Sequence, residues 1–504
     1  MKNRFFTENT GLVFLAVLKL AIQLANSAGY GYFVDELYYL ALVRHLDFGY
    51  VDVPPVVPLL MAVSNHALGT SLFAMHLFPA LAGAVMVFFA GLLAREMGGG
   101  RFAQYLTAVA VIFAPIWLVL NSWFAYDAFD QLATVILIYV SLRVAKAATP
   151  QRWIVFGIVA GVGMMTKLTM LMTCAALGLA WLPTPQRKSL VTRWPWAAAG
   201  VATLVCLPFA LWQYNHGWPL LTYWQHYAQF RPHPGIFQFF TGLVLALHPL
   251  TLPIWLSGLF FLCCHPTGRR YRFLGWMYII LLVLYTMVMR TEYRMLVSAC
   301  VPLLAAGAVQ LESTFATARR QALAQALAWG YVVALCASGL FFIPETLPGA
   351  APTQADQTQP DHVALRIGWP EMTEQVAAIY HSLPECTLGH CAIYTSYYGE
   401  AAAIDFFGEA YGLPKAVSNH LTYQVWGPGQ QRHDAIIAFG KRFSVQETAQ
   451  GTIPLGKICE EVTLAGTVTG QPGSIAYEKG LPVYVCKRPL VSLQEIWEAL
   501  EFYY

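Results

Sequence analysis

Long runs of apolar residues, separated by short polar segments, occupy most of the chain up to residue 343. A helix needs about 17–25 apolar residues to cross the hydrocarbon core of a bilayer. Counted in this way, the sequence predicts eleven membrane-spanning helices, at 11–29, 72–94, 103–121, 128–146, 153–166, 168–183, 196–214, 236–264, 273–289, 294–312 and 324–343. The apolar stretch 54–69 contains Pro54, Pro55 and Pro58, which favour a re-entrant or surface-lying segment instead.

The pattern changes near residue 348, where the sequence PGAAPTQADQTQP (348–360) has no apolar period and is rich in Pro, Gln and Ala. Such a composition is typical of a linker. We therefore predict a transmembrane domain at 1–347, a linker at 348–360 and an extracytoplasmic domain at 361–504. Strand-like runs at 435–440 and 481–486, and an Ala-rich helix around Glu400 and Asp405, favour a small α/β fold for that domain. The predicted fold class is a polytopic α-helical membrane protein with a C-terminal α/β domain.

The composition supports the membrane interpretation. Hydrophobic residues make up 57% of the chain, charged residues make up 11%, and the mean hydropathy is +0.51. Soluble domains contain about 25% charged residues, so this chain cannot cover a water-soluble surface, and a soluble enzyme is excluded. The 30 basic and 27 acidic residues nearly balance, which gives no reason to expect nucleic acid as a partner.

The basic residues predict how the chain is oriented in the membrane. With the N-terminus inside, most Lys and Arg residues fall in the inner loops, as the positive-inside rule requires. The outer loops hold only Arg44, Lys167, Arg231, Arg290 and Arg294. An odd number of spans then places the C-terminal domain outside. We expect a multi-pass protein of the bacterial inner membrane, in contact with membrane lipids, whose C-terminal domain is extracytoplasmic.

The ten cysteines divide into two groups. Six lie in apolar helices, where a small buried side chain is the ordinary interpretation. Four lie in the C-terminal domain, at Cys386, Cys391, Cys459 and Cys486. An even number outside the membrane favours two disulfides, with proximity pairing Cys386 to Cys391 and Cys459 to Cys486. A zinc site is the alternative, although the paired spacing usual for zinc is missing.

Acidic residues mark the outer face. Asp35 and Glu36 follow the first apolar run, and Asp127 and Asp130 lie at the outer end of another helix, three positions apart and hence on one helix face. Carboxylates beside apolar helices are costly to desolvate and tend to be functional. Two acidic groups around one cleft suit general-base or metal-assisted transfer. The structural alternatives are an aromatic and acidic interface belt and, for Asp130, a charge that stabilises a helix N-terminus.

A specific resemblance extends, in order, along nearly the whole chain. The sequence resembles the bacterial glycosyltransferases of superfamily C that are related to the protein O-mannosyltransferases and the lipid A aminoarabinose transferase. The matching stretches are YGYFVDELYYLA (30–41), RHLDFGYVDVPPVVPLL (44–60), LLAREMGGGRFAQYL (92–106), AFDQL (128–132), the Thr-Lys pair at 166–167, HGWP (216–219), YRMLVSACVPLLAAGAVQLE (293–312), YYGEAAAIDFFGEAYGLP (397–414) and SNHLTYQVWGP (418–428).

The resemblance implies an enzyme that takes a sugar from a polyprenyl-phosphate donor and attaches it to a lipid, glycan or protein acceptor, generally with inversion of the anomeric centre. Asp35 would act as general base on the acceptor hydroxyl, or orient it, and Glu36 would support it. The family's second acidic position falls on Asp130 or Asp127, which would bind the acceptor or hold a divalent cation. The superfamily includes metal-using and metal-free members, so the resemblance leaves a cation as an open candidate and implies no certain cofactor.

The leaving lipid phosphate requires positive charge at the outer face. The resemblance places Lys167 at the family's interrupted helix pair, whereas Arg290 and Arg294 lie in a short outer loop where many relatives carry Lys. Arginine makes bidentate contacts with phosphate. These three residues are the predicted donor-phosphate site, and the predicted substrate-contacting residues are Tyr38, Tyr39, Asp52 and Tyr293.

A transporter or lipid flippase is the alternative function, because many spans with polar residues also fit it. Transporters usually show repeated halves with helices broken at corresponding positions, and the sequence shows no such repeat. The donor sugar and the acceptor stay open at this stage.

Overall fold

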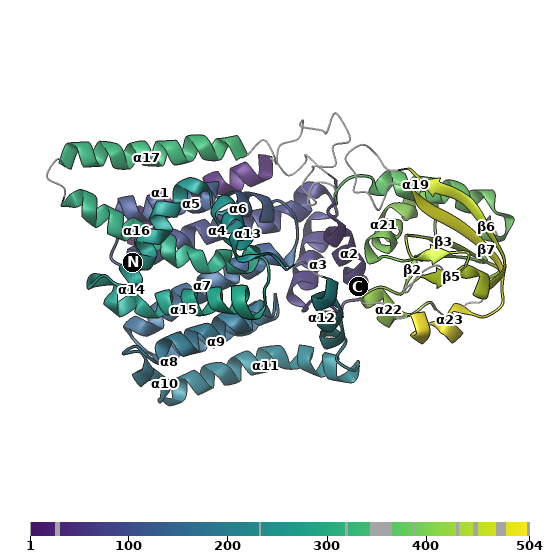
Figure 1. Cartoon of the computed structure of the whole chain (residues 1–504), viewed down its shortest axis with the longest axis horizontal. Helices are drawn as coiled ribbons and strands as arrows, with labels where there is room; N and C mark the ends of the chain where they lie inside the picture. The colour runs from purple at the N-terminus through teal and green to yellow at the C-terminus, as the bar shows by residue number, and fades with distance from the viewer. Residues whose placement is uncertain are drawn as a thin grey trace.

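The computed structural model describes residues 2–25, 31–230, 233–317, 321–342, 365–387, 389–429, 433–446, 452–469 and 480–500. A bundle of helices forms one part of the molecule, and a small sheet domain built from the C-terminal residues lies at one end of it (Figure 1). The predicted linker 348–360 and Arg231 lie outside the described residues. The predicted arrangement, a domain of apolar helices followed by an α/β domain, is confirmed.

The helices of the bundle follow the predicted apolar runs. In chain order they are α1 (Lys2–Ala25), α2 (Val34–Val43), α3 (Val56–Leu68), α4 (Leu72–Glu96), α5 (Arg101–Phe113), α6 (Pro115–Leu120), α7 (Tyr126–Lys146), α8 (Pro150–Met164), α9 (Thr169–Trp181), α10 (Arg187–Leu190), α11 (Arg193–Asn215), α12 (Pro219–Phe230), α13 (Ile236–Ala246), α14 (Leu252–Cys263), α15 (Arg272–Val283), α16 (Val297–Ala316) and α17 (Gln321–Phe342). Within the described part of the chain, six helical segments are long and apolar enough to cross a membrane, and the bent pair α13 and α14 would make a seventh. Four shorter apolar helices coincide with α1, α3, α5 and α9.

Prolines break two of the predicted runs. The run 103–121 is divided at Ala114, whose backbone is extended, because Pro115 has no N–H to donate and disfavours helical backbone in the residue before it. The run 236–264, which we expect to cross as one span, forms two helices that meet at 93°. Pro249 lies at this corner, and His248 before it has a φ of 74°. The two breaks turn both runs into pairs of shorter helices.

Glycines bring α14 and α16 into backbone contact. A Cβ atom on Gly258 would lie 1.9 Å from the carbonyl oxygen of Leu303, and one on Gly307 would lie 1.8 Å from that of Ile254. Small residues allow this close approach in membrane bundles, where dispersion contacts rather than water exclusion hold helices together. Replacing either glycine with a larger residue would force the two helices apart.

The C-terminal domain is built on a five-stranded mixed sheet. Its strands are β1 (Cys391–Thr395), β2 (Val417–Ser418), β3 (Ala435–Phe439), β6 (Cys459–Val468) and β7 (Leu481–Pro489), in the spatial order β2-β1-β3-β7-β6. Strands β2, β1 and β3 run parallel, whereas β7 pairs antiparallel with β3 and β6. The domain also contains a small parallel pair, β4 (Phe443–Ser444) with β5 (Ile453–Pro454), and the helices α19 (Trp369–Ser382), α20 (Pro384–Thr387), α21 (Tyr398–Phe407), α22 (Thr422–Trp426) and α23 (Leu493–Ile496). The predicted strands at 435–440 and 481–486 are β3 and β7.

The structure joins Cys386 to Cys391 and Cys459 to Cys486. The first bridge closes the turn between α20 and β1. The second links the start of β6 to β7, so it crosses the antiparallel pair at the edge of the sheet.

Loss of the Cys459–Cys486 bridge should destabilise the C-terminal domain more than loss of the other bridge. A disulfide restricts the unfolded chain more strongly when it closes a longer loop, and the two bridges join residues 27 and 5 positions apart. The chain-entropy relation gives about 3.5 kcal/mol for the longer loop. In thermal unfolding of the purified protein, Cys459→Ser with Cys486→Ser should lower the melting temperature further than Cys386→Ser with Cys391→Ser. Equal melting temperatures would contradict this.

Candidate active site

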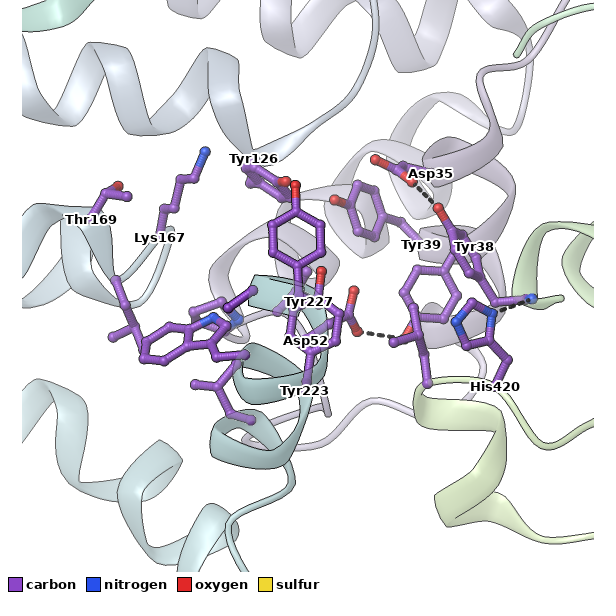
Figure 2. A pocket seen from close by; sticks show the side chains of 18 of the residues that line it. Asp35, Tyr38, Tyr39, Asp52, Tyr126, Lys167, Thr169, Tyr223, Tyr227 and His420 are labelled. Atoms are coloured by element: carbon purple, nitrogen blue, oxygen red, sulfur yellow. Dashed lines mark hydrogen bonds between the residues drawn. The ribbon is translucent and has the colours of Figure 1, made fainter. Parts of the chain in front are cut away.

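A cavity of about 930 Å³ lies where the helical bundle meets the C-terminal domain. Three parts of the chain line it: α2 with the segment that follows it up to Pro54, the ends of several bundle helices, and the loops of the C-terminal domain. Figure 2 shows Lys167 and Thr169 on one side and His420 on the other, with Asp35 and Asp52 between them. The cavity therefore has a membrane-domain wall and a C-terminal-domain wall, with carboxylates in the middle.

Asp35 lies in the first turn of α2 and lines the cavity. The hydroxyl of Tyr398, from the C-terminal domain, donates a hydrogen bond of 2.8 Å to its Oδ1. Burial raises the pKa of Asp35 to about 6, and the nearby charges of Asp127 and Glu36 act in the same direction, whereas Tyr398 and Arg294 oppose the shift. A carboxyl with a pKa near neutral is suited to proton transfer, because it exchanges protons readily at the pH at which an enzyme works.

Glu36 does not line the cavity, although it is adjacent to Asp35. Its side chain is fully buried and accepts hydrogen bonds from the backbone N–H groups of Phe33 (2.8 Å) and Phe124 (2.7 Å). It also contacts Nε2 of His76 at 2.9 Å. Burial alone would raise the pKa of Glu36, but His76, Arg366 and the backbone N–H of Phe124 hold it below its ordinary value. Through these contacts, Glu36 holds the residue before α2 against the connection between α6 and α7.

Asp52, in the segment between α2 and α3, is a second carboxylate that lines the cavity. The Tyr38 hydroxyl donates to its Oδ1 at 2.8 Å, and the same hydroxyl lies 2.7 Å from Oγ1 of Thr422 in the C-terminal domain. Burial raises the pKa of Asp52 to about 7, Tyr38 opposes that shift, and the charge of Asp35 adds to it. Tyr38, Tyr39 and Asp52, predicted from the sequence to contact substrate, all line the cavity.

The second predicted acidic pair lies behind the membrane-domain wall. Asp127 forms an ion pair of 2.7 Å with Lys167, and Asp130 accepts a hydrogen bond of 3.3 Å from the hydroxyl of Thr169. The cavity is lined by Lys167 and Thr169 rather than by the two carboxylates. Lys167 lies in the break between α8 and α9, and its ammonium also lies 4.3 Å from the ring centroid of Tyr126. The two acids therefore orient the residues that face the cavity.

Residues 290–295 lie beside the cavity, but the residues of this segment that line it are not those predicted from the sequence. Thr291 and Met295 line it, whereas Arg290, Tyr293 and Arg294 do not. Arg294 pairs with Glu292 at 2.6 Å. The ring of Tyr293 instead packs so closely on α13 that a Cβ atom on Gly242 would lie 2.5 Å from it. Lys167 is thus the predicted phosphate-binding cation that faces the cavity.

The C-terminal domain contributes residues that directly follow its three parallel strands. Tyr398 follows β1, His420 follows β2, and Lys441 and Arg442 follow β3. Ligands commonly bind beyond the carboxyl ends of parallel strands, where loops from neighbouring strands converge. His420, Lys441 and Arg442 were not predicted from the sequence to belong to the site. The signal available for the last two was their place immediately after the predicted strand 435–440.

A divalent cation would require several His, Cys, Asp or Glu side chains close together at the site. Among the described residues, no three His, Cys, Asp or Glu side chains come together in a group that could hold a metal ion. Asp127, which the resemblance offers as a possible cation ligand, forms an ion pair with Lys167. In the described part of the chain, the side chains at the cavity therefore do not form a ligand set for a divalent cation.

The fold and the site together define a polytopic membrane protein with a carboxylate-lined cavity under a separate α/β domain. Residues 52–212 match the family described as dolichyl-phosphate-mannose-protein mannosyltransferase. No curated protein sequence matches the chain at a significant level.

Three solved structures show where else this fold occurs. ArnT from Cupriavidus metallidurans, bound to undecaprenyl phosphate, aligns with a TM-score of 0.60 and 13% identity over 95% of this chain and 98% of that chain. The oligosaccharyltransferase AglB from Archaeoglobus fulgidus aligns with a TM-score of 0.54 and 11% identity over 86% and 70% of the two chains. The mycobacterial arabinofuranosyltransferase AftD aligns with a TM-score of 0.51 and 14% identity over 94% and 41%. The chain therefore has the fold of these three structures, in agreement with the fold that the resemblance implies.

Proposed function

We propose that the protein transfers a sugar from a polyprenyl-phosphate donor to an acceptor at the outer face of the bacterial inner membrane. The observation that carries this proposal is the cavity, in which a partly buried carboxyl, Asp35, and a cation, Lys167, face a common space at one end of the bundle. The shared fold supports it, because ArnT of Cupriavidus metallidurans was solved with undecaprenyl phosphate bound. The excess of Lys and Arg in the predicted inner loops supports the orientation.

The membrane-domain wall suits the donor. Lys167 supplies the positive charge that a lipid phosphate requires, and apolar or aromatic side chains surround it. Leu168 and Met172 of the α8–α9 region, Leu220 and Trp224 of α12, and Met289 also line this wall. An apolar lining of this kind suits the first isoprene units of a polyprenyl chain that enters from the bilayer. We therefore assign the donor phosphate to Lys167.

We assign the acceptor to the C-terminal-domain wall, so that Asp35 lies between the two substrates. In the ionised state Asp35 takes the proton from the acceptor hydroxyl. The acceptor oxygen forms a bond to the anomeric carbon while the bond from that carbon to the phosphate oxygen breaks, and the electron pair leaves with the polyprenyl phosphate. Attack from the face opposite to the phosphate inverts the anomeric centre. The Lys167 ammonium stabilises the negative charge that develops on the leaving group.

Lys167→Met should weaken the binding of undecaprenyl phosphate by about tenfold or more, because a hydrogen bond between charged groups contributes about 1.5–3 kcal/mol. The dissociation constant can be measured with the purified protein in nanodiscs. Lys146→Met is the matched control, since Lys146 forms a similar ion pair with Glu96 (2.5 Å) at the inner end of α7. Equal effects of the two substitutions would contradict the assignment of Lys167 to the donor phosphate.

A transporter or lipid flippase is less well supported. Such a protein usually shows repeated halves with helices broken at corresponding positions, and the sequence shows no such repeat. It would move the lipid-linked sugar without cleaving it. Detection of the cleaved carrier, polyprenyl phosphate, together with glycosylated acceptor therefore separates the two functions.

A further inference from the structure

Two hydrogen-bonded struts connect the cavity carboxylates to the C-terminal domain. The first is the bond from Tyr398 to Asp35, whose residues are 363 positions apart in the sequence. The second runs from Asp52 through Tyr38 to Thr422. Asp35 and Asp52 thus each accept a hydrogen bond from a tyrosine that the C-terminal domain supplies or contacts.

Tyr398 is held in one position by its surroundings. Its ring packs against those of Tyr397 and Tyr38, with centroids 4.5 Å and 4.9 Å away, and its backbone N–H donates to Nδ1 of His420 at 3.2 Å. The next residue brings α21 directly onto α2, because a Cβ atom on Gly399 would lie 2.4 Å from a methyl group of Val34. A rigid phenol in this place fixes the direction of the bond to Asp35.

When Asp52 is ionised, the second strut has one possible arrangement of protons. An ionised Asp52 can only accept, so Tyr38 donates its one proton to Asp52, and the Thr422 hydroxyl donates to the Tyr38 oxygen. The backbone N–H of Val51 in turn donates to Oγ1 of Thr422 at 3.2 Å. The strut therefore ties Val51 directly, and Asp52 through Tyr38, to the first residue of α22.

Charged side chains dock the same domain onto the bundle. The guanidinium of Arg366 is buried, with Nη2 3.1 Å from the hydroxyl of Ser122 and its central carbon 4.7 Å from the ring centroid of Trp123. On the other side Arg44 pairs with Glu409 at 2.7 Å. These contacts hold α21 against α2, which is the condition for the bond between Tyr398 and Asp35.

We propose that the C-terminal domain is a positioning element of the active site, in which Tyr398 is the positioning residue that holds Oδ1 of Asp35 and leaves Oδ2 to receive the acceptor proton. The inference rests on the proposed function for the role of Asp35. It assigns the domain a part in catalysis beyond covering the cavity.

The hydrogen bond has a measurable consequence for the ionisation of Asp35. Tyr398 stabilises the charged form of the carboxyl, so its removal should raise the pKa above the value of about 6. The other charged or titratable groups around Asp35 are Glu36 and Tyr39 of α2, Asp52, Tyr126 and Asp127 of α7, and Arg294. These groups are unchanged in a Tyr398→Phe protein, so the shift isolates the contribution of one hydroxyl.

Infrared difference spectroscopy of the full-length protein tests this without a substrate. The carbonyl band of protonated Asp35, identified by its loss in Asp35→Asn, is followed as the pH is raised. We expect a midpoint near 6 in the wild type and one about one pH unit higher in Tyr398→Phe, since a pKa unit corresponds to the net strength of such a bond. Tyr423→Phe is the matched control, because the Tyr423 hydroxyl donates to a different buried carboxylate, Asp405, at 2.8 Å. In the Tyr423→Phe protein, the midpoint of the Asp35 titration should equal that of the wild type.

An unchanged midpoint in Tyr398→Phe, or an equal shift in Tyr423→Phe, would overturn the inference. The result is independent of sugar transfer, so the positioning role and the proposed function fail separately. Where transfer can be assayed, the acidic limb of the pH–rate profile of Tyr398→Phe should move to higher pH by the same amount. A loss of activity without that move would identify a merely structural role and would also overturn the inference.

Discussion

Asp35→Asn should abolish sugar transfer while the protein remains folded. The amide cannot accept the acceptor proton, and a positioned base typically contributes a factor of about 10²–10⁴ to the rate. The substitution changes one oxygen for a nitrogen, and Oδ1 can still accept the hydrogen bond of 2.8 Å from Tyr398. Transfer measured in membranes or nanodiscs should fall by at least about a hundredfold, with a melting temperature close to that of the wild type.

Asp52→Asn provides the comparison for Asp35→Asn. Asp52 also lies partly buried in the cavity wall, accepts a hydrogen bond of 2.8 Å from a tyrosine, and has a pKa raised to about 7 by desolvation. Its amide variant should retain more activity, because Asp52 is assigned to substrate contact rather than to proton transfer. A fully active Asp35→Asn protein, or a greater loss in Asp52→Asn, would show that the base is a different residue.

Glu36→Ala should destabilise the folded protein more than any other single substitution considered. It leaves the N–H groups of Phe33 and Phe124 and the imidazole of His76 without their common buried acceptor. Each buried donor that is left without its acceptor costs about 1–3 kcal/mol. The melting temperature in detergent should drop strongly, and the yield of folded protein should fall with it.

Glu312→Ala is the control for Glu36→Ala. Glu312 also accepts two backbone hydrogen bonds, from Gly100 (2.5 Å) and Ala103 (3.3 Å), but at a partly exposed end of the bundle. Water can replace an exposed acceptor, so this variant should melt within a few degrees of the wild type. If the two substitutions had equal effects, the buried position of Glu36 would not be what stabilises the outer loop.

The helices of the bundle could be predicted from the sequence because a membrane span leaves a long apolar run. The breaks in these runs were harder to predict. Pro115 divides one run in two, but Pro79, Pro208 and Pro302 lie inside continuous helices. Whether a proline breaks a helix depends on whether neighbouring elements satisfy the freed backbone groups, and this is not visible in the local sequence. The sharp corner at His248 and Pro249 belongs to the same class of feature.

The candidate site could be predicted in part. Asp35 and Glu36 were both visible as acids after the first apolar run, but neighbouring residues of a helix point about 100° apart. Only one of them faces the cavity, and the sequence does not say which. Lys167 was visible as a cation between two short apolar runs. Tyr398 and His420 belong to a domain that meets the first loop only in the folded protein, and their contacts could not be predicted from spacing.

The measurement that tests the central claim most directly is mass spectrometry of lipids and glycoconjugates from a deletion strain complemented with the wild type or with Asp35→Asn. We expect the deletion strain and the Asp35→Asn strain to accumulate an intact polyprenyl-phosphate sugar and to lack one sugar on an envelope acceptor. Wild-type complementation should restore the acceptor mass and consume the donor. Identical profiles in the wild-type and Asp35→Asn strains would contradict the assignment of the protein as a glycosyltransferase that uses Asp35.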